Sequence, residues 1–162
     1  MLPPLNGEDQ IHEPPCQEAC PLHTDVRGYL ILTSASRFEE AYRVARANNP
    51  LLSTCGHACS AQCEAACRRG QLDRPLAIRR IKRFLSDAFA EERPVTRPGK
   101  QTNQSVAIIG AGPAGLTAAH YLASFGHGVT IFEASAQTGG MDALGVPRFV
   151  KNWLGISKPQ RS

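Results

Sequence analysis

The chain has 162 residues, of which 42% are hydrophobic, 20% charged and 6% aromatic. This length suffices for one ordinary domain, or for a small domain and part of another. No apolar stretch approaches the roughly 20 residues of a membrane-spanning helix, and residues 1–9 lack the basic cluster and apolar core of a secretory signal. We therefore expect a cytoplasmic protein without a transmembrane segment.

The formal net charge of +4 is modest, although many basic residues lie close together in the stretch 68–83. They are not interleaved with stacking aromatic residues, and no nucleic-acid-binding motif accompanies them. Such a run is usually a solvated helix face. The charge pattern therefore does not favour nucleic acid as a partner. The basic residues are Arg68, Arg69, Arg74, Arg79, Arg80, Lys82 and Arg83.

The first half of the chain predicts helices behind an N-terminal arm at 1–15 that is rich in proline and polar residues. Thr24 is the expected N-cap of a first helix, and Ser36 with Glu39 forms the capping box of a second. Apolar residues at helical spacing predict a further helix in the stretch 76–92. We therefore expect a small all-helical bundle.

The cysteines are the most informative residues of this half, and none follows position 67. Clustered cysteines in a chain without a secretory signal more often bind metal than form a disulfide framework. On one continuous helix, Cys59 and Cys67 would lie about 12 Å apart, too far for one cluster. Either the backbone turns in this stretch, or the cysteines serve different centres, or some are only packed. The six are Cys16, Cys20, Cys55, Cys59, Cys63 and Cys67.

Six thiols suit either zinc or an iron–sulfur cluster. Three residues separate the neighbouring cysteines, whereas zinc ribbons use two, and no histidine pair has the spacing of a zinc finger. We interpret His57 as a bystander. The Cys20-Pro21 pair is typical of iron–sulfur ligand runs. An iron–sulfur cluster is thus favoured, with zinc or unliganded core cysteines as the alternatives.

The second half follows an expected linker at 93–104 and has the pattern of a dinucleotide-binding βαβ unit. Its predicted elements are a strand at 105–109, a glycine turn at 110–115, a helix at 116–125 and a strand at 128–132.

The turn fits the G-x-G-x-x-G pattern, in which the glycines allow a tight turn, close approach of a pyrophosphate and close helix packing. The helix N-terminus then faces the phosphates. Glu133, at the end of the second strand, can accept hydrogen bonds from ribose hydroxyls; it would repel a 2′-phosphate and so favours FAD or NAD over NADP. The alternative is a turn needed only for packing. The candidate turn residues are Gly110, Gly112, Pro113, Ala114 and Gly115.

Gly139, Gly140 and Met141 follow this acid. Two glycines here would let the backbone run close beside a cofactor, although an ordinary turn has the same composition.

Together these motifs resemble the N-terminal iron–sulfur helical domain of the glutamate synthase small subunit family, which dihydropyrimidine dehydrogenase and the ferredoxin:NADP transhydrogenase large subunit share. The resemblance covers roughly residues 14–149. In that family an FAD domain follows, beginning like 106–133 here. The segments that carry the resemblance are 15–21, 49–51, 55–70, 75–78, 82–84, 139–141 and 144–147.

The resemblance implies electron transfer between NAD(P)H, FAD and [4Fe-4S] clusters. Fuller members carry two clusters through an extra C-x₂-C upstream, where this chain has the stretch 11–14. For this chain the resemblance therefore implies one [4Fe-4S] cluster rather than two, together with FAD. By motif position the expected ligands are Cys20, Cys59 and Cys63. Cys16 or Cys67 would be the fourth ligand, and Cys55 is expected to be structural.

We thus expect an α + α/β chain with a helical [4Fe-4S] domain at 16–92 and a partial FAD-binding Rossmann unit at 105–162. Family members continue well beyond this point, so an autonomous NAD(P)H oxidoreductase is not expected. The prediction is an electron-transfer subunit without acid–base catalytic residues. Its partners would be other redox subunits, whether ferredoxin-like, flavin-binding or NAD(P)H-binding. The alternatives are a docking subunit with a relic Rossmann unit, a fragment of a longer oxidoreductase, and a zinc adapter.

Overall fold

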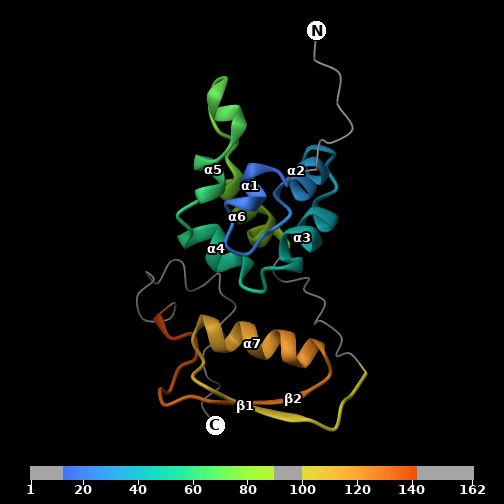
Figure 1. Cartoon of the computed structure of the whole chain (residues 1–162), viewed down its shortest axis with the longest axis vertical. Coiled ribbons are helices and arrows are strands. Elements are labelled where there is room, and N and C mark those ends of the chain that lie inside the picture. The colour runs from blue at the N-terminus through green and yellow to red at the C-terminus, as the bar shows by residue number, and fades with distance from the viewer. Residues whose placement is uncertain (1–12, 90–99, 142–162) are drawn as a thin grey trace.

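A computed structural model describes residues 13–89 and 100–141, and it contains a helical domain followed by a βαβ segment (Figure 1). This arrangement confirms the expected fold class. The expected arm up to residue 12, most of the linker and the stretch after 141 lie outside the described residues. In chain order the elements are α1 (Pro15–Glu18), α2 (Val26–Ser34), α3 (Phe38–Ala47), α4 (Leu52–Ala58), α5 (Gln62–Ala65), the 3₁₀ helix η1 (Arg68–Gln71), α6 (Ile78–Phe89), β1 (Ser105–Ile109), α7 (Pro113–Ser124) and β2 (Gly128–Phe132).

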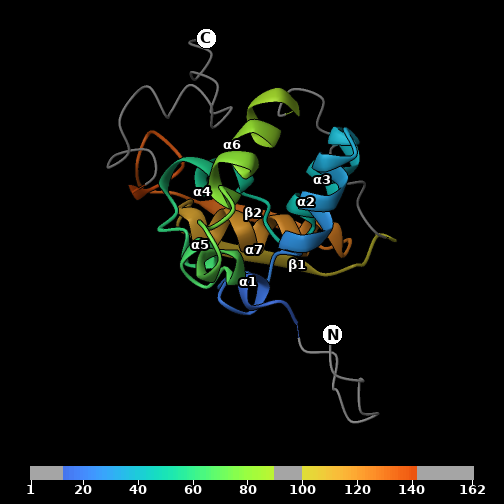
Figure 2. The same cartoon turned by 90° about the horizontal axis from the view of Figure 1, so that it is seen from above.

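The core of the helical domain lies where α6 packs against α3 and α4 and where α2 packs against α3 (Figure 2). The apolar stripes expected from the sequence are buried there, among them Tyr29, Tyr42 and Leu85. α6 also buries one charged residue, Lys82, in its apolar face. Within the part of the chain that the structure describes, no helix has the length and hydrophobicity needed to cross a membrane.

The predicted cap of α2 is wrong by one residue. Asp25 is the N-cap, and its carboxylate accepts a hydrogen bond of 2.8 Å from the backbone N–H of Gly28. Thr24 is instead fully buried, and its Oγ1 lies 3.5 Å from Cys20 Sγ. An aspartate caps as well as a threonine, so Thr24 is released to pack beside a cysteine.

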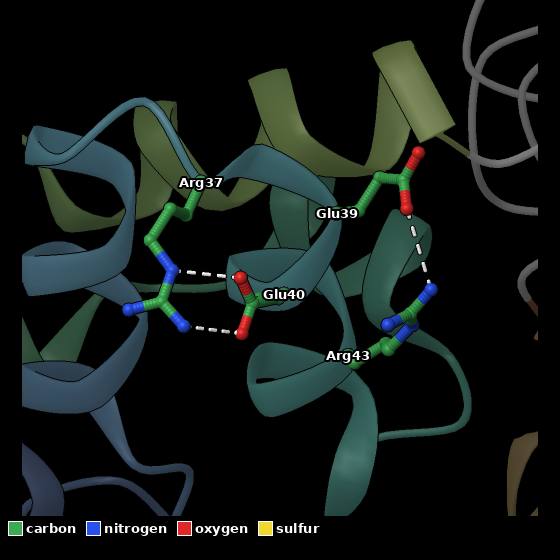
Figure 3. A network of polar contacts seen from close by, with 4 residues as sticks. All are labelled: Arg37, Glu39, Glu40 and Arg43. Atoms are coloured by element: carbon green, nitrogen blue, oxygen red, sulfur yellow. Dashed lines mark hydrogen bonds and ion pairs between the residues drawn. The ribbon is translucent and has the colours of Figure 1, made fainter.

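The predicted capping box of α3 does not form. Ser36 has a left-handed φ of 60°, and the helix begins after Arg37 without a side-chain cap. Two exposed ion pairs lie on the first turns instead, as Figure 3 shows. Arg37 Nε and Nη2 bind the two oxygens of Glu40 at 2.7 and 2.6 Å, and Arg43 Nη2 lies 3.3 Å from Glu39 Oε2.

The cysteine-rich stretch is not one helix, because the backbone turns between α4 and α5. Cys59 is extended, and Ala61 is left-handed with φ 57°. Gly56, although a glycine, is not the residue at which the helix ends. It lies inside α4, where an added Cβ would come within 2.9 Å of Arg83 Cα on α6. The glycine thus lets the two helix backbones approach closely.

In the second segment, β1 and β2 pair in parallel, from Ser105 opposite Gly128 to Ile109 opposite Phe132. α7 packs on these strands (Figure 1). It begins at Pro113, three residues before the predicted start, because proline is favoured in the first turn of a helix. Ile109 is 84% exposed and Phe132 55% exposed, so this small sheet buries little of its apolar surface.

Candidate functional site

All six cysteines are free thiols in the helical domain, so they form no disulfide framework. Four of them form a set that we call the four-thiol group: Cys20, Cys55, Cys59 and Cys63. The thiols of Cys55 and Cys63 each lie within electrostatic range of those of Cys20 and Cys59. Three of the four were expected ligands, whereas Cys55 was expected to be structural.

Each thiol of this group comes from a different part of the backbone. Cys20 follows α1, Cys55 lies in α4, Cys59 ends α4, and Cys63 lies in the short α5. The backbone N–H of Ala61 donates to Cys59 Sγ at 3.4 Å. The left-handed turn at Ala61 therefore brings cysteines of two separate helices to one place.

The first turn of α6 ties this region together through Arg79. Its guanidinium donates to the backbone oxygen of Cys59 at 2.7 Å, and its backbone N–H donates to Glu64 Oε1 at 2.7 Å. Three residues further along α6, Lys82 is only 4% exposed. Its ammonium interacts electrostatically with the thiols of Cys20, Cys55 and Cys63. A buried cation thus faces the four-thiol group.

Burial governs how readily these thiols ionise. It raises the pKa of Cys55 and of Cys63, and the Lys82 ammonium opposes the rise in both. Burial also acts on Cys20, but hydrogen bonds with Thr24 outweigh it and lower the pKa of that thiol. A bound metal centre would remove the burial penalty, since metal ligands are thiolates.

Buried hydrogen-bond donors beside the thiols offer a test of whether a cluster fits. Tyr29 is fully buried, and its hydroxyl has no hydrogen-bond partner among the described residues. The thiols of Cys63, Cys20 and Cys16 lie within electrostatic range of this phenol. Asn49 Nδ2 likewise lacks a partner in the described part, while Asn49 Oδ1 lies 3.6 Å from Cys55 Sγ. Sulfur acceptors of an iron–sulfur cluster suit such donors.

The two remaining cysteines, Cys16 and Cys67, are neighbours of each other and line an open groove of about 960 Å³. Burial raises the pKa of Cys16, and the neighbouring Cys67 contributes to the rise. Arg27 and Arg68 also line this groove, together with apolar residues such as Ile31. The two alternatives for the fourth ligand thus line the same groove.

Among the described residues, no three histidine, cysteine or acidic side chains converge in the way that a single metal ion requires. A [4Fe-4S] cluster binds its four thiolates through four different irons, so its ligands lie further apart than those of one zinc ion. His57 packs elsewhere: its ring Nδ1 lies 2.9 Å from the backbone oxygen of Ser53, and Nε2 lies 3.8 Å from Asp87.

The glycine turn between β1 and α7 combines a left-handed residue, a close backbone contact and an open position. Gly110 is left-handed with φ 94°, and a Cβ at Gly115 would overlap the Gly110 backbone oxygen. Nothing lies within 4 Å of the position of a Cβ at Gly112. The turn is thus closed on its helix side and open at Gly112, where Pro113 and Ala114 begin α7. The conformation of Gly110 suits the expected tight turn and that of Gly115 the expected close packing, while pyrophosphate binding at Gly112 stays a prediction.

Glu133 follows β2 and holds this turn in place. One carboxylate oxygen accepts from the backbone N–H of Ala111 at 2.7 Å, and the other from that of Ser135 at 2.8 Å. These backbone hydrogen bonds hold the pKa of Glu133 below its usual value. Each oxygen keeps a further lone pair for a ribose hydroxyl.

The Gly139-Gly140 pair lies against the same turn. The N–H of Gly139 donates to the backbone oxygen of Ala111 at 2.8 Å. Gly140 is left-handed with φ 53°, and a Cβ there would come within 3.0 Å of Gly112 Cα. Met141 is 72% exposed beside it. The backbone at Gly140 therefore lies close to the glycine turn, while its expected approach to a cofactor stays a prediction.

A helical domain with a group of buried and half-buried free thiols, followed by a glycine turn between parallel strands, defines the class of iron–sulfur proteins with a nucleotide-binding segment. The family described as "Dihydropyrimidine dehydrogenase domain II, 4Fe-4S cluster" matches residues 10–94. The chain belongs to this family. A second match, to an NAD(P)-binding Rossmann-like domain, covers residues 108–142. Both matches confirm the resemblance inferred from the motifs.

Several curated proteins resemble the chain over most of its length. It is 40% identical to the NADP(+)-dependent formate dehydrogenase subunit beta of Moorella thermoacetica, over 83% of this chain and 22% of that protein. It is 42% identical to the NADPH-Fe(3+) oxidoreductase subunit beta of Geobacter sulfurreducens, over 83% and 21% respectively. It is 38% identical to the NAD-dependent dihydropyrimidine dehydrogenase subunit PreT of Escherichia coli, over 85% and 34%. The chain spans about a fifth to a third of these relatives.

Proposed function

We propose that the helical domain holds one [4Fe-4S] cluster and that Cys20, Cys55, Cys59 and Cys63 are its ligands. The observation that carries the proposal is the four-thiol group, three of whose members lie within electrostatic range of one buried cation, Lys82. Motif position alone suggested Cys16 or Cys67 as the fourth ligand. Both of those thiols line the open groove, whereas Cys55 lies within electrostatic range of Cys20 and Cys59, which favours Cys55 instead.

The side chain of Asn49 supports a thiolate at Cys55. A thiolate accepts hydrogen bonds, whereas Asn49 now directs an oxygen toward that sulfur and leaves its buried amide nitrogen unsatisfied. Rotating the amide by 180° would direct the nitrogen to the sulfur, since the two orientations fill the same space. Ligation of Cys55 would thus satisfy a donor that the free thiol leaves unpaired.

We also propose FAD as the nucleotide of the glycine turn. FAD, when bound, supplies hydride and one-electron chemistry. The chain's own contribution would be to bind the pyrophosphate at the N-terminus of α7 and to orient the ribose through Glu133. The acidic side chain at this position argues against a cofactor with a 2′-phosphate.

The resulting function is an electron-transfer component of a larger redox complex. The relatives' names, which are those of subunits of formate, dihydropyrimidine and iron(III) oxidoreductases, support a component that works with further redox subunits. Six free thiols suit a reducing compartment, so we assign the protein to the cytoplasm.

The test is an anaerobic purification of the chain with iron, sulfide and flavin quantified together and a visible spectrum recorded. About four irons and one FAD per chain are expected. Iron without flavin would favour a docking role with a relic Rossmann unit, and zinc or no metal would overturn the proposal.

The ligand assignment is tested by single serine variants. Cys55→Ser should lose most of the iron, while Cys16→Ser and Cys67→Ser should keep it. Loss of iron in either groove variant, with iron retained in Cys55→Ser, would return the fourth ligand to Cys16 or Cys67. Circular dichroism of each variant would show whether the helical domain still folds.

A further inference from the structure

We infer that the Lys82 ammonium and the Tyr29 hydroxyl are buried donors that raise the reduction potential of the cluster by compensating its negative charge. This inference rests on the proposed function. It assigns to both residues a tuning role, not that of ligands.

Lys82 occupies a position where helical periodicity calls for an apolar residue. It lies four residues after Ile78 and three before Leu85, and both of these core residues are fully buried. Lys82 itself is 4% exposed, whereas its neighbour Arg80 is exposed on the same helix. An ordinary core helix would place leucine or isoleucine here.

Among the described residues, no carboxylate lies within ion-pair distance of the Lys82 ammonium. Burying a charge without a partner is costly. The groups that face its ammonium are the thiols of Cys20, Cys55 and Cys63. A buried cation in this position therefore calls for an anion among the thiols.

The packing of α4 on α6 fixes Lys82 close to these cysteines. Gly56 follows Cys55 directly, and its backbone lies against that of Arg83, which follows Lys82. Arg79, one turn earlier, hydrogen-bonds the backbone oxygen of Cys59. Both ends of this stretch of α6 are thus tied to the cysteine-bearing backbone, and the Lys82 side chain has little freedom to leave.

Tyr29 approaches the same thiols from α2. Its ring is part of the core, yet its hydroxyl makes no hydrogen bond within the described part of the chain. A buried hydroxyl without a hydrogen-bond partner destabilises the fold. The thiols of Cys63, Cys20 and Cys16 lie within electrostatic range of this hydroxyl, as does the carboxylate of Glu64. A thiolate sulfur of a bound cluster would accept its proton in a hydrogen bond.

Both donors should favour the reduced cluster. A cluster with four thiolates is negatively charged, and one-electron reduction adds one more negative charge. Fixed positive charge and hydrogen bonds at the sulfurs stabilise the more negative state, particularly where burial weakens solvent screening. The two residues should therefore raise the reduction potential.

The experiment is an anaerobic redox titration of the cluster in the full chain, followed by electron paramagnetic resonance. Lys82→Met removes the charge but keeps much of the volume, and Tyr29→Phe removes only the hydroxyl. We expect the midpoint potential to move to more negative values in both, with the larger shift for Lys82→Met. Arg80→Met, which loses the same charge from an exposed site on α6, should leave the potential unchanged. Lys82→Arg keeps the positive charge, so it should shift the midpoint potential less than Lys82→Met does.

Iron content separates this inference from the proposed function. A wild-type chain without iron would contradict the proposed cluster itself. Iron-loaded Lys82→Met and Tyr29→Phe with wild-type potentials would overturn the tuning role alone. If Lys82→Met fails to retain iron, the potential of Tyr29→Phe tests the tuning role instead. An unshifted potential in Tyr29→Phe would then overturn the inference.

Discussion

Gly56 is the residue whose substitution best tests the packing behind the thiol group. An alanine Cβ there would meet Arg83 Cα at 2.9 Å and push α4 away from α6. We expect Gly56→Ala to lower the free energy of unfolding of the helical domain by about 1–3 kcal/mol, because overpacking outweighs the gain in helix propensity. Iron retention should fall with it, as Cys55 moves.

Chemical denaturation and iron analysis measure both effects. Thr54→Ala is the matched control, because it also raises the helix propensity of α4 but adds no atom. A Gly56→Ala chain as stable as the control would mean that the two backbones do not pack this closely.

Glu133 provides a pH-dependent prediction at the glycine turn. Its pKa is lowered by the backbone N–H groups that it accepts from. Its stabilisation of the turn is therefore complete above the unfolded pKa of about 4.3 and is lost as the pH falls through the lower folded pKa. Amide NMR signals of Ala111 and Ser135 should titrate together with a midpoint below 4.3. In Glu133→Gln this titration should disappear, and a midpoint at or above the usual value would contradict the hydrogen bonds.

At the scale of elements, the start of α3 distinguishes the expected capping box from the observed left-handed turn. A left-handed φ costs a non-glycine residue roughly 1 kcal/mol, so Ser36→Gly should raise the free energy of unfolding by about that amount. Ser36→Ala should change it little, whereas a capping box would lose about 1 kcal/mol. Arg43→Gly, at a right-handed position of the same helix, should destabilise by about 1 kcal/mol. Thermal melts followed by circular dichroism compare the three variants.

At the scale of the whole molecule, the two segments should differ in their protection from hydrogen exchange. The helical domain buries a continuous core, whereas α7 contains no fully buried residue and the strands alternate between partly and fully exposed positions. Amides of α3 and α6 should therefore exchange more slowly than those of β1 and β2.

Removal of iron should act on one segment only. Formation of a metal site is coupled to folding, so anaerobic chelation should speed exchange in α4 to α6 and leave β1, β2 and α7 unchanged. Hydrogen exchange with mass spectrometry reads both segments in one sample. Identical exchange in the helical domain before and after chelation would contradict a cluster that organises it.

The sequence by itself determined the architecture and most of the candidate residues. Helical periodicity located α2, α3 and α6, and the G-x-G-x-x-G pattern located the turn, both strands and Glu133, because these features depend on local spacing. The cysteine pattern indicated metal chemistry and the family. The helix caps could not be predicted from the sequence alone, since Asp25 and Thr24 are both good N-cap residues and only packing decided between them.

Only the tertiary structure decided how the cysteines are grouped. The left-handed Ala61 redirects the chain between α4 and α5, and an alanine carries no sequence signal for such a turn. That turn, with the close packing that Gly56 allows, brings Cys55 within electrostatic range of Cys20 and Cys59, while Cys16 and Cys67 line an open groove. The burial of Lys82 was equally invisible, because a lysine in an otherwise basic stretch is usually exposed, and only the packing of α6 against the thiols makes it a buried charge.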